Sequence, residues 1–140
     1  MSYAVQSDMV NRFGEQELIQ LTDRDRTGAI DTVVLDRALA DATAEIDGYL
    51  AARYQLPLTS TPTVLVRVCA DLARYHLHDD HLPEPVQVRY KAAIDLLRQV
   101  STGRVSLGLS ETGESPTSND GAEITSGGRV WDRNDSKGFL

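Results

Sequence analysis

The segment 23–31 carries the oxygen ligands with which a calcium-binding loop begins. Oxygen-bearing side chains alternate along it, and Gly28 stands at the sixth position, where such a loop turns sharply. The candidate ligands are Asp23, Asp25, Thr27 and Asp31. At the twelfth position, where a bidentate glutamate would complete the cage, the chain has Val34. The alternative is an Asp-rich turn in which Asp31 caps the following helix and Asp23 holds the loop backbone.

Two further groups of side chains could do chemistry. His76, His78 and His81 suggest zinc, but residues two apart on a helix face away from each other, whereas metal pairs are three or four apart. This pattern is more typical of a solvated helix end with cationic residues. Cys69 lies in the most apolar segment, and a buried thiol without electropositive neighbours is inert. We therefore expect no catalytic residues, no metal and no cofactor.

The composition favours one acidic domain. The chain has 140 residues and a net charge of −7, from 14 Lys and Arg against 21 Asp and Glu. That excess repels phosphate, which disfavours tight binding to DNA but allows DNA to pass nearby. The single cysteine excludes an internal disulfide and indicates cytosolic synthesis. No apolar run approaches the roughly 20 residues that cross a bilayer, so we expect no membrane role.

The periodicity predicts an all-α fold, a small bundle of three main helices preceded by short ones. Gly14 divides two short N-terminal helices, and Ser7 is the expected cap of the first. The long helices are expected at 31–54, from Pro62 through His76, and from Pro85 to Gly103, where the helical body (1–103) ends. The segment 64–68 is β-branched enough to form a strand, but helical spacing continues beyond it.

The first long helix has an apolar stripe and an acidic surface. The stripe consists of Leu35, Leu39, Ala42, Ile46 and Tyr49. Four acids lie largely off it and predict an acidic outer surface: Asp36, Asp41, Glu45 and Asp47. In the central helix, the spacing of Arg67, Asp71 and Arg74 predicts ion pairs within the helix.

Beyond the body, residues 104–140 are predicted to form a flexible spacer and a docking arm. The part from 110 to 128 is polar and without periodicity, which is typical of a spacer. The part from 129 to 140 holds large apolar side chains, which make sense if they dock on this body or on a neighbour. These are Val130, Trp131, Phe139 and Leu140. A frayed tail is the alternative.

Several segments resemble the head-to-tail connector, or neck adaptor, proteins of Mu-like tailed phages. They include FGEQELIQLTD at 13–23, the helix 38–50, RYQLPL at 53–58, CADLARY at 69–75 and RVWDR at 129–133, with Lys137 and Phe139 near the end. The likeness covers nearly the whole chain apart from the spacer. It adds Arg133 and Lys137 to the expected partner-binding residues of the arm.

The resemblance implies a structural protein of the virion neck, made in the cytoplasm of the host bacterium. Such adaptors form a ring, typically of twelve subunits, beneath the portal protein, and a stopper or tail-completion protein contacts the other side. The body builds the wall of a DNA conduit, and the arm engages the portal or a neighbouring copy. The acidic helix surface would let DNA slide through without specific binding. A small calcium-binding module and a generic helical interaction adaptor remain as alternatives.

Overall fold

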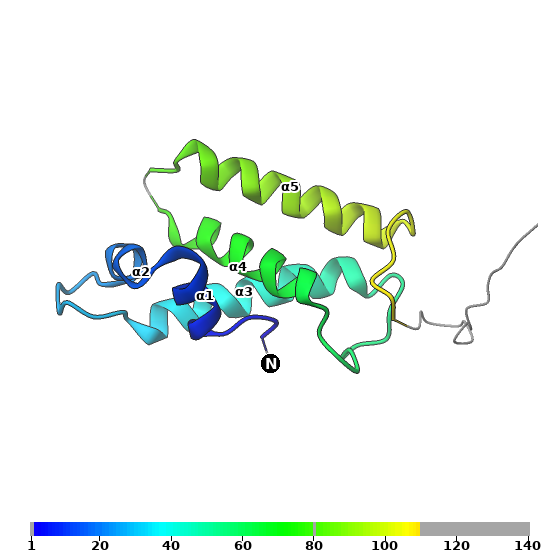
Figure 1. The fold of residues 1–140 in the computed structure, drawn as a ribbon, viewed down its shortest axis with the longest axis horizontal. Helices are drawn as coiled ribbons and strands as arrows, with labels where there is room; N and C mark the ends of the chain where they lie inside the picture. Colours follow the sequence, from blue (N-terminus) through cyan, green and yellow to red (C-terminus); the bar gives the residue numbers. More distant parts are fainter. Residues whose placement is uncertain (1, 80, 110–140) are drawn as a thin grey trace, which may run out of the picture. The chain divides into compact units, whose positions relative to one another are not determined.

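The computed structural model describes residues 2–79 and 81–109. Within these ranges the chain forms five helices and no strand, so the predicted all-α fold is confirmed (Figure 1). The helices are α1 (Gln6–Phe13), α2 (Glu15–Thr22), α3 (Thr32–Leu50), α4 (Thr63–Leu77) and α5 (Glu84–Ser101). One compact unit extends to Leu107. The predicted spacer and docking arm from residue 110 onward lie outside the described residues.

Helix α3 begins where its capping residue predicts. The Asp31 carboxylate accepts hydrogen bonds from the backbone N–H groups of Val33 (3.0 Å) and Val34 (3.4 Å), which otherwise have no partner in the first turn. Its buried stripe is Leu35, Ala38, Leu39, Ala42, Ile46 and Leu50. Thus Leu50, four residues after Ile46, takes the inward position that was predicted for Tyr49, which is only half-buried.

The end of α3 was predicted too late. The helix stops at Leu50 and not at Tyr54. The N–H groups of Arg53 and Tyr54 both donate to the Leu50 carbonyl, at 2.9 and 2.8 Å, so the chain turns here. The Tyr54 side chain is buried, and its hydroxyl accepts a hydrogen bond from the Leu107 N–H at 3.0 Å. That bond holds the segment after α5 against the helical unit.

Helix α4 is the centre of the bundle and packs against α1, α3 and α5 (Figure 1). Seven of its apolar residues are buried, more than one stripe would supply: Leu65, Val68, Cys69, Ala70, Leu72, Ala73 and Leu77. The prediction of a helix in preference to a strand is therefore confirmed. Its start was predicted one residue too early, because Pro62 has the extended conformation of an N-cap (ψ 145°) and Thr63 is the first helical residue.

Helix α5 ends as Gly103 predicted. Gly103 has a φ of +85°, a left-handed conformation in which its N–H donates to the Val100 carbonyl at 3.1 Å. The next N–H, of Arg104, donates to the Gln99 carbonyl at 2.8 Å. A Cβ at position 103 would lie 2.8 Å from Nη1 of Arg53, at the end of a flexible side chain that can shift, so it is the backbone angle that selects glycine.

The two short helices, α1 and α2, meet at Gly14, whose φ of +91° makes the break that was predicted there. The predicted cap Ser7 is wrong, because α1 already begins at Gln6 and Ser7 is an exposed residue within it. The Asp8 carboxylate instead accepts a hydrogen bond from the Val5 N–H at 2.9 Å. Met9 of α1 and Leu18 of α2 are fully buried and anchor both helices to the bundle.

Candidate functional site

The calcium-like loop uses its carboxylates to bind its own backbone. The Asp23 carboxylate accepts hydrogen bonds from the N–H groups of Thr27 (2.8 Å) and Gly28 (2.7 Å), and these bonds hold the pKa of Asp23 below its ordinary value. Asp31 caps α3, while its own N–H donates to the buried Thr22 hydroxyl at 2.9 Å. Asp25 is exposed. Asp23 and Asp31 thus have the roles predicted for an Asp-rich turn.

The three histidines do not converge. His76 Nε2 lies 3.1 Å from Oε1 of Glu45 on α3, while His78 Nδ1 lies 2.9 Å from the Arg74 carbonyl. His81 is exposed. In the described ranges, no group of three or more His, Cys, Asp and Glu side chains is placed to hold a metal ion. Each of the first two histidines therefore makes a separate structural contact.

Cys69 is a buried thiol, as predicted. Its side chain is fully buried between α3 and α4, with Sγ 3.7 Å from the hydroxyl of Thr43. Burial raises the pKa of the Cys69 thiol, which keeps it protonated and poorly nucleophilic at neutral pH.

A polar and aromatic cluster that the sequence did not predict joins α3, α4 and α5. The Tyr90 hydroxyl donates to Oε2 of Glu45 at 3.1 Å, and the His76 ring approaches the other oxygen of the same carboxylate. The Tyr90 ring also stacks on Tyr75, with ring centroids 3.7 Å apart. Burial and the hydrogen bond to Glu45 raise the pKa of Tyr90 to about 12. One carboxylate of α3 therefore fixes side chains from both other long helices.

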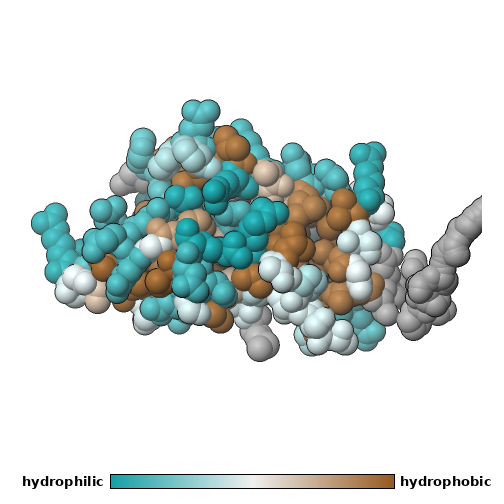
Figure 2. Space-filling model, in the orientation of Figure 1, coloured by the Kyte–Doolittle hydropathy of each residue, from teal (hydrophilic) through white to brown (hydrophobic). Residues whose placement is uncertain are grey.

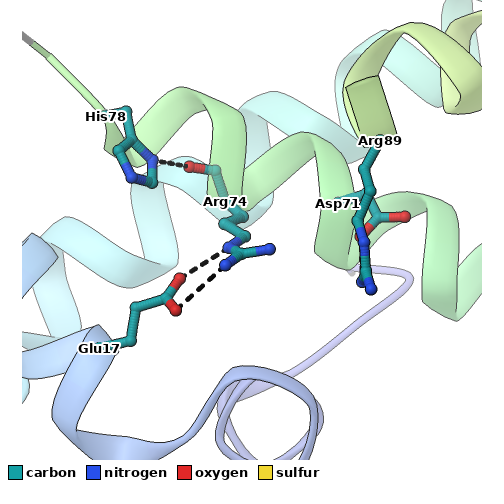
Figure 3. A network of polar contacts seen from close by, with 5 residues as sticks. All are labelled: Glu17, Asp71, Arg74, His78 and Arg89. Carbon is teal, nitrogen blue, oxygen red and sulfur yellow. Dashed lines mark hydrogen bonds and ion pairs between the residues drawn. The ribbon is translucent and has the colours of Figure 1, made fainter. Parts of the chain in front are cut away.

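Arg74 makes a second set of side-chain contacts between helices (Figure 3). Its guanidinium donates two hydrogen bonds to the Glu17 carboxylate of α2, at 2.6 and 3.1 Å, and lies 4.4 Å from the centroid of the Phe13 ring of α1. The sequence had predicted an ion pair of Arg74 within α4, which is wrong because the side chain turns toward α2. Through this residue α4 holds both short helices.

Asp71 is a buried carboxylate, only 3% exposed, on the side of α4 that faces α5 (Figure 3). Its oxygens lie 3.6 Å from Nη1 of Arg67 and 3.8 Å from Nη1 of Arg89. The predicted pair with Arg67 is confirmed, and the pair with Arg89 of α5 is new. Burial raises the pKa of Asp71, and the nearby arginines oppose this shift.

The four acids predicted to form an outer surface of α3 differ in their surroundings. Asp36 and Asp41 are exposed, whereas Glu45 and Asp47 are half-buried. Glu45 belongs to the cluster above, and Asp47 accepts a hydrogen bond from the Tyr3 hydroxyl. At about 100° per residue, Asp36 and Asp41 lie roughly 140° apart around the helix. Asp36 and Asp41 therefore lie at opposite edges of the solvent-facing side of the helix, and the four acids do not form one continuous acidic stripe.

The remaining surface of the described unit is mixed. Figure 2 shows a largely polar face on which apolar side chains gather where Figure 1 shows the N-terminal half of α4 and the C-terminal half of α5. No helix in the described part of the chain is long and apolar enough to span a membrane. The predicted partner-binding residues Val130, Trp131, Arg133, Lys137, Phe139 and Leu140 lie outside the described residues.

Comparison with known proteins identifies the family. The family model described as "Bacteriophage Mu, Gp36" matches residues 3–126. The Mu-like prophage FluMu protein gp36 of Haemophilus influenzae is 38% identical over 138 residues, which cover 99% of this chain and 98% of that protein. Gene product J of Escherichia phage Mu is 38% identical over 143 residues, which cover the full length of both chains. The resemblance to proteins of Mu-like phages is thereby confirmed, and the chain belongs to the Bacteriophage Mu Gp36 family.

Proposed function

We propose that this protein is a structural component of the phage particle that forms a ring beneath the portal and joins the head to the tail. The observation that carries the proposal is membership of a Mu phage family over nearly the whole chain. The geometry agrees with a structural role. The side chains with the most potential for chemistry, Asp23, Cys69 and His76, are engaged in contacts that hold the helical unit together.

In this proposal the ring encloses a conduit through which the genome passes. Its neighbours are the portal protein, further copies of the same chain, typically twelve in all, and a stopper or tail-completion protein. The excess of 21 acidic over 14 basic residues would give the wall a charge that repels phosphate, so that DNA slides without adhering. The overall charge supports this step better than one helix surface does, because Glu45 and Asp47 are hydrogen-bonded within the subunit.

The arm from 129 to 140 is proposed to dock on the portal or on a neighbouring copy. Truncation after Ser110 should leave the helical unit folded, because the contacts described above lie before that residue, but should abolish incorporation into particles. The substitution Trp131→Ala should weaken docking by about 2 kcal/mol if the indole is a buried anchor. A truncated protein that enters particles as well as the full chain would contradict this part of the proposal.

The experiment that tests the function is deletion of the gene, followed by electron microscopy of the particles that form. A neck component predicts heads, full or leaking DNA, that carry no tails, and restoration of tailed particles when the protein is supplied in trans. Tailed and infectious particles formed without the protein would refute the proposal.

A further inference from the structure

The outward side of α3 combines exposed small and apolar residues with charges of alternating sign. Val33 is 65% exposed, and the small residues Ala40 and Ala44 are also exposed. Beside them stand three exposed charged residues in the order acid, base, acid: Asp36, Arg37 and Asp41. We call these six residues the α3 face. It points away from the buried stripe of the same helix, and so away from the core.

The outward side of α5 has the opposite order of charges. Val88 is 56% exposed, and Ala92 is exposed one turn later. The exposed charged residues here run base, acid, base: Lys91, Asp95 and Arg98. We call these five residues the α5 face. Asp95 and Arg98 form only a loose pair, 3.6 Å apart and both about two-thirds exposed, so both remain available to a partner.

A groove of about 410 Å³ adjoins the α5 face. Two cations of that face, Lys91 and Arg98, line the groove together with two carboxylates, Glu45 and Asp95, and with the side chains of Tyr49, Tyr90 and Ile94. Tyrosine and arginine dominate the binding energy of protein interfaces, because they offer large contact areas with a polar end. Lys91 and Arg98 at this groove can pair with acids such as Asp36 of an approaching α3 face, and Ile94 and the tyrosine rings can contact its Val33.

From these observations we propose that the α3 face of one copy binds the α5 face of the next copy. The α3 face carries two acids and one base, and the α5 face carries two bases and one acid, so two like faces repel through their net charge whereas unlike faces attract. Because the two faces belong to different helices and both point away from the core, one copy can bind a neighbour on each side. A head-to-tail contact of this kind generates a closed ring when its rotation closes.

This inference rests on the proposed ring and deepens it. It also places Asp36 and Asp41 at the contact between copies. Their charge alone had suggested a place in the wall of the conduit. Most of the proposed contact is between charged side chains, so reversing the charges on either face should weaken it.

Charge reversal on each face, alone and in combination, tests the contact. The first variant carries Asp36→Lys and Asp41→Lys, and the second carries Lys91→Glu and Arg98→Glu. Each is supplied in trans to phage that lacks the gene, and tailed infectious particles are counted. Each variant alone should reduce the yield on the order of tenfold or more, because its two faces then carry the same sign. Supplied together, they should restore the yield, since the reversed α3 face of the first variant meets the reversed α5 face of the second, and the two unreversed faces meet each other.

A single chain that carries all four reversals provides a second arm, because its two faces are again complementary and it should restore the yield by itself. Asp25→Lys and Arg104→Glu are matched controls at exposed positions outside both faces and should leave the yield unchanged. Circular dichroism and thermal melting establish that each variant is folded; one that does not fold is replaced by its neutral counterpart, with Asn for Asp and Gln for Lys or Arg.

Two results would overturn the contact: single-face variants that restore the yield as well as the wild type, or folded variants that are defective and stay defective when supplied together. If instead the proposed function is wrong, phage without the gene will form tailed particles before any variant is supplied. The two failures can therefore be told apart.

Discussion

Replacing Arg74 with alanine should destabilise the helical unit more than the loss of a surface ion pair would. The Arg74 and Glu17 side chains are only 18% and 29% exposed, and two charge-assisted hydrogen bonds join them. Loss of such bonds in a mostly desolvated site costs about 1.5 to 3 kcal/mol, and loss of the contact with the Phe13 ring adds roughly 0.5 kcal/mol. Because water can partly solvate Glu17 in the variant, we expect a total of about 2 kcal/mol. In a unit of this size that lowers Tm by roughly 10 °C.

Urea denaturation of matched variants measures this cost. Arg24→Ala is the control, because Arg24 pairs with Asp79 at 2.8 Å but both side chains are more than half exposed. That pair should contribute no more than about 0.5 kcal/mol. Arg74→Lys keeps the charge but loses the paired hydrogen-bond geometry. Its loss of unfolding free energy should therefore lie between the losses for Arg74→Ala and Arg24→Ala. Equal free energies of unfolding for Arg74→Ala and Arg24→Ala would refute the view that Arg74 holds α1 and α2 on α4.

Three further predictions concern single side chains. Because burial raises the pKa of Asp71 in the folded state, its charged form opposes folding above that pKa, and this cost disappears as the pH falls through it. Asp71→Asn should therefore melt at or above the wild-type temperature at pH 7, and any advantage should shrink toward pH 4; a large loss of stability at pH 7 would show that the ion pairs outweigh burial. Asp31→Ala should lower the free energy of unfolding in urea by about 1 kcal/mol through loss of the α3 cap, and an unchanged value would contradict that role. Cys69 should react with a thiol reagent only as fast as the unit unfolds, whereas rapid labelling of the native protein would show an accessible thiol.

The parts of the fold that were predictable depend on neighbours in the sequence. Asp31 caps α3 through N–H groups two and three residues away, and Gly103 ends α5 through carbonyls within four residues. The buried stripe of α3 follows from helical periodicity alone. Errors occurred where local signals compete, as at Ser7, where the extended Val5 and the Asp8 carboxylate begin the helix earlier.

The ties between helices were not predictable, because they join residues far apart in the chain. Arg74 and Glu17 are 57 residues apart, and Tyr90 and Glu45 are 45 apart. Spacing alone predicted a partner for Arg74 within its own helix, and it predicted that Glu45 would belong to an exposed acidic surface. The predicted docking residues of the arm remain a prediction.

The most direct test of the proposed role is cryo-electron microscopy of intact particles at a resolution that reveals helices. If the protein forms the neck ring, copies of the α1–α5 unit will fit the density between the portal and the tail, arranged around a central channel. A density at that junction that cannot accommodate the unit, or the presence of the unit elsewhere in the particle, would contradict it.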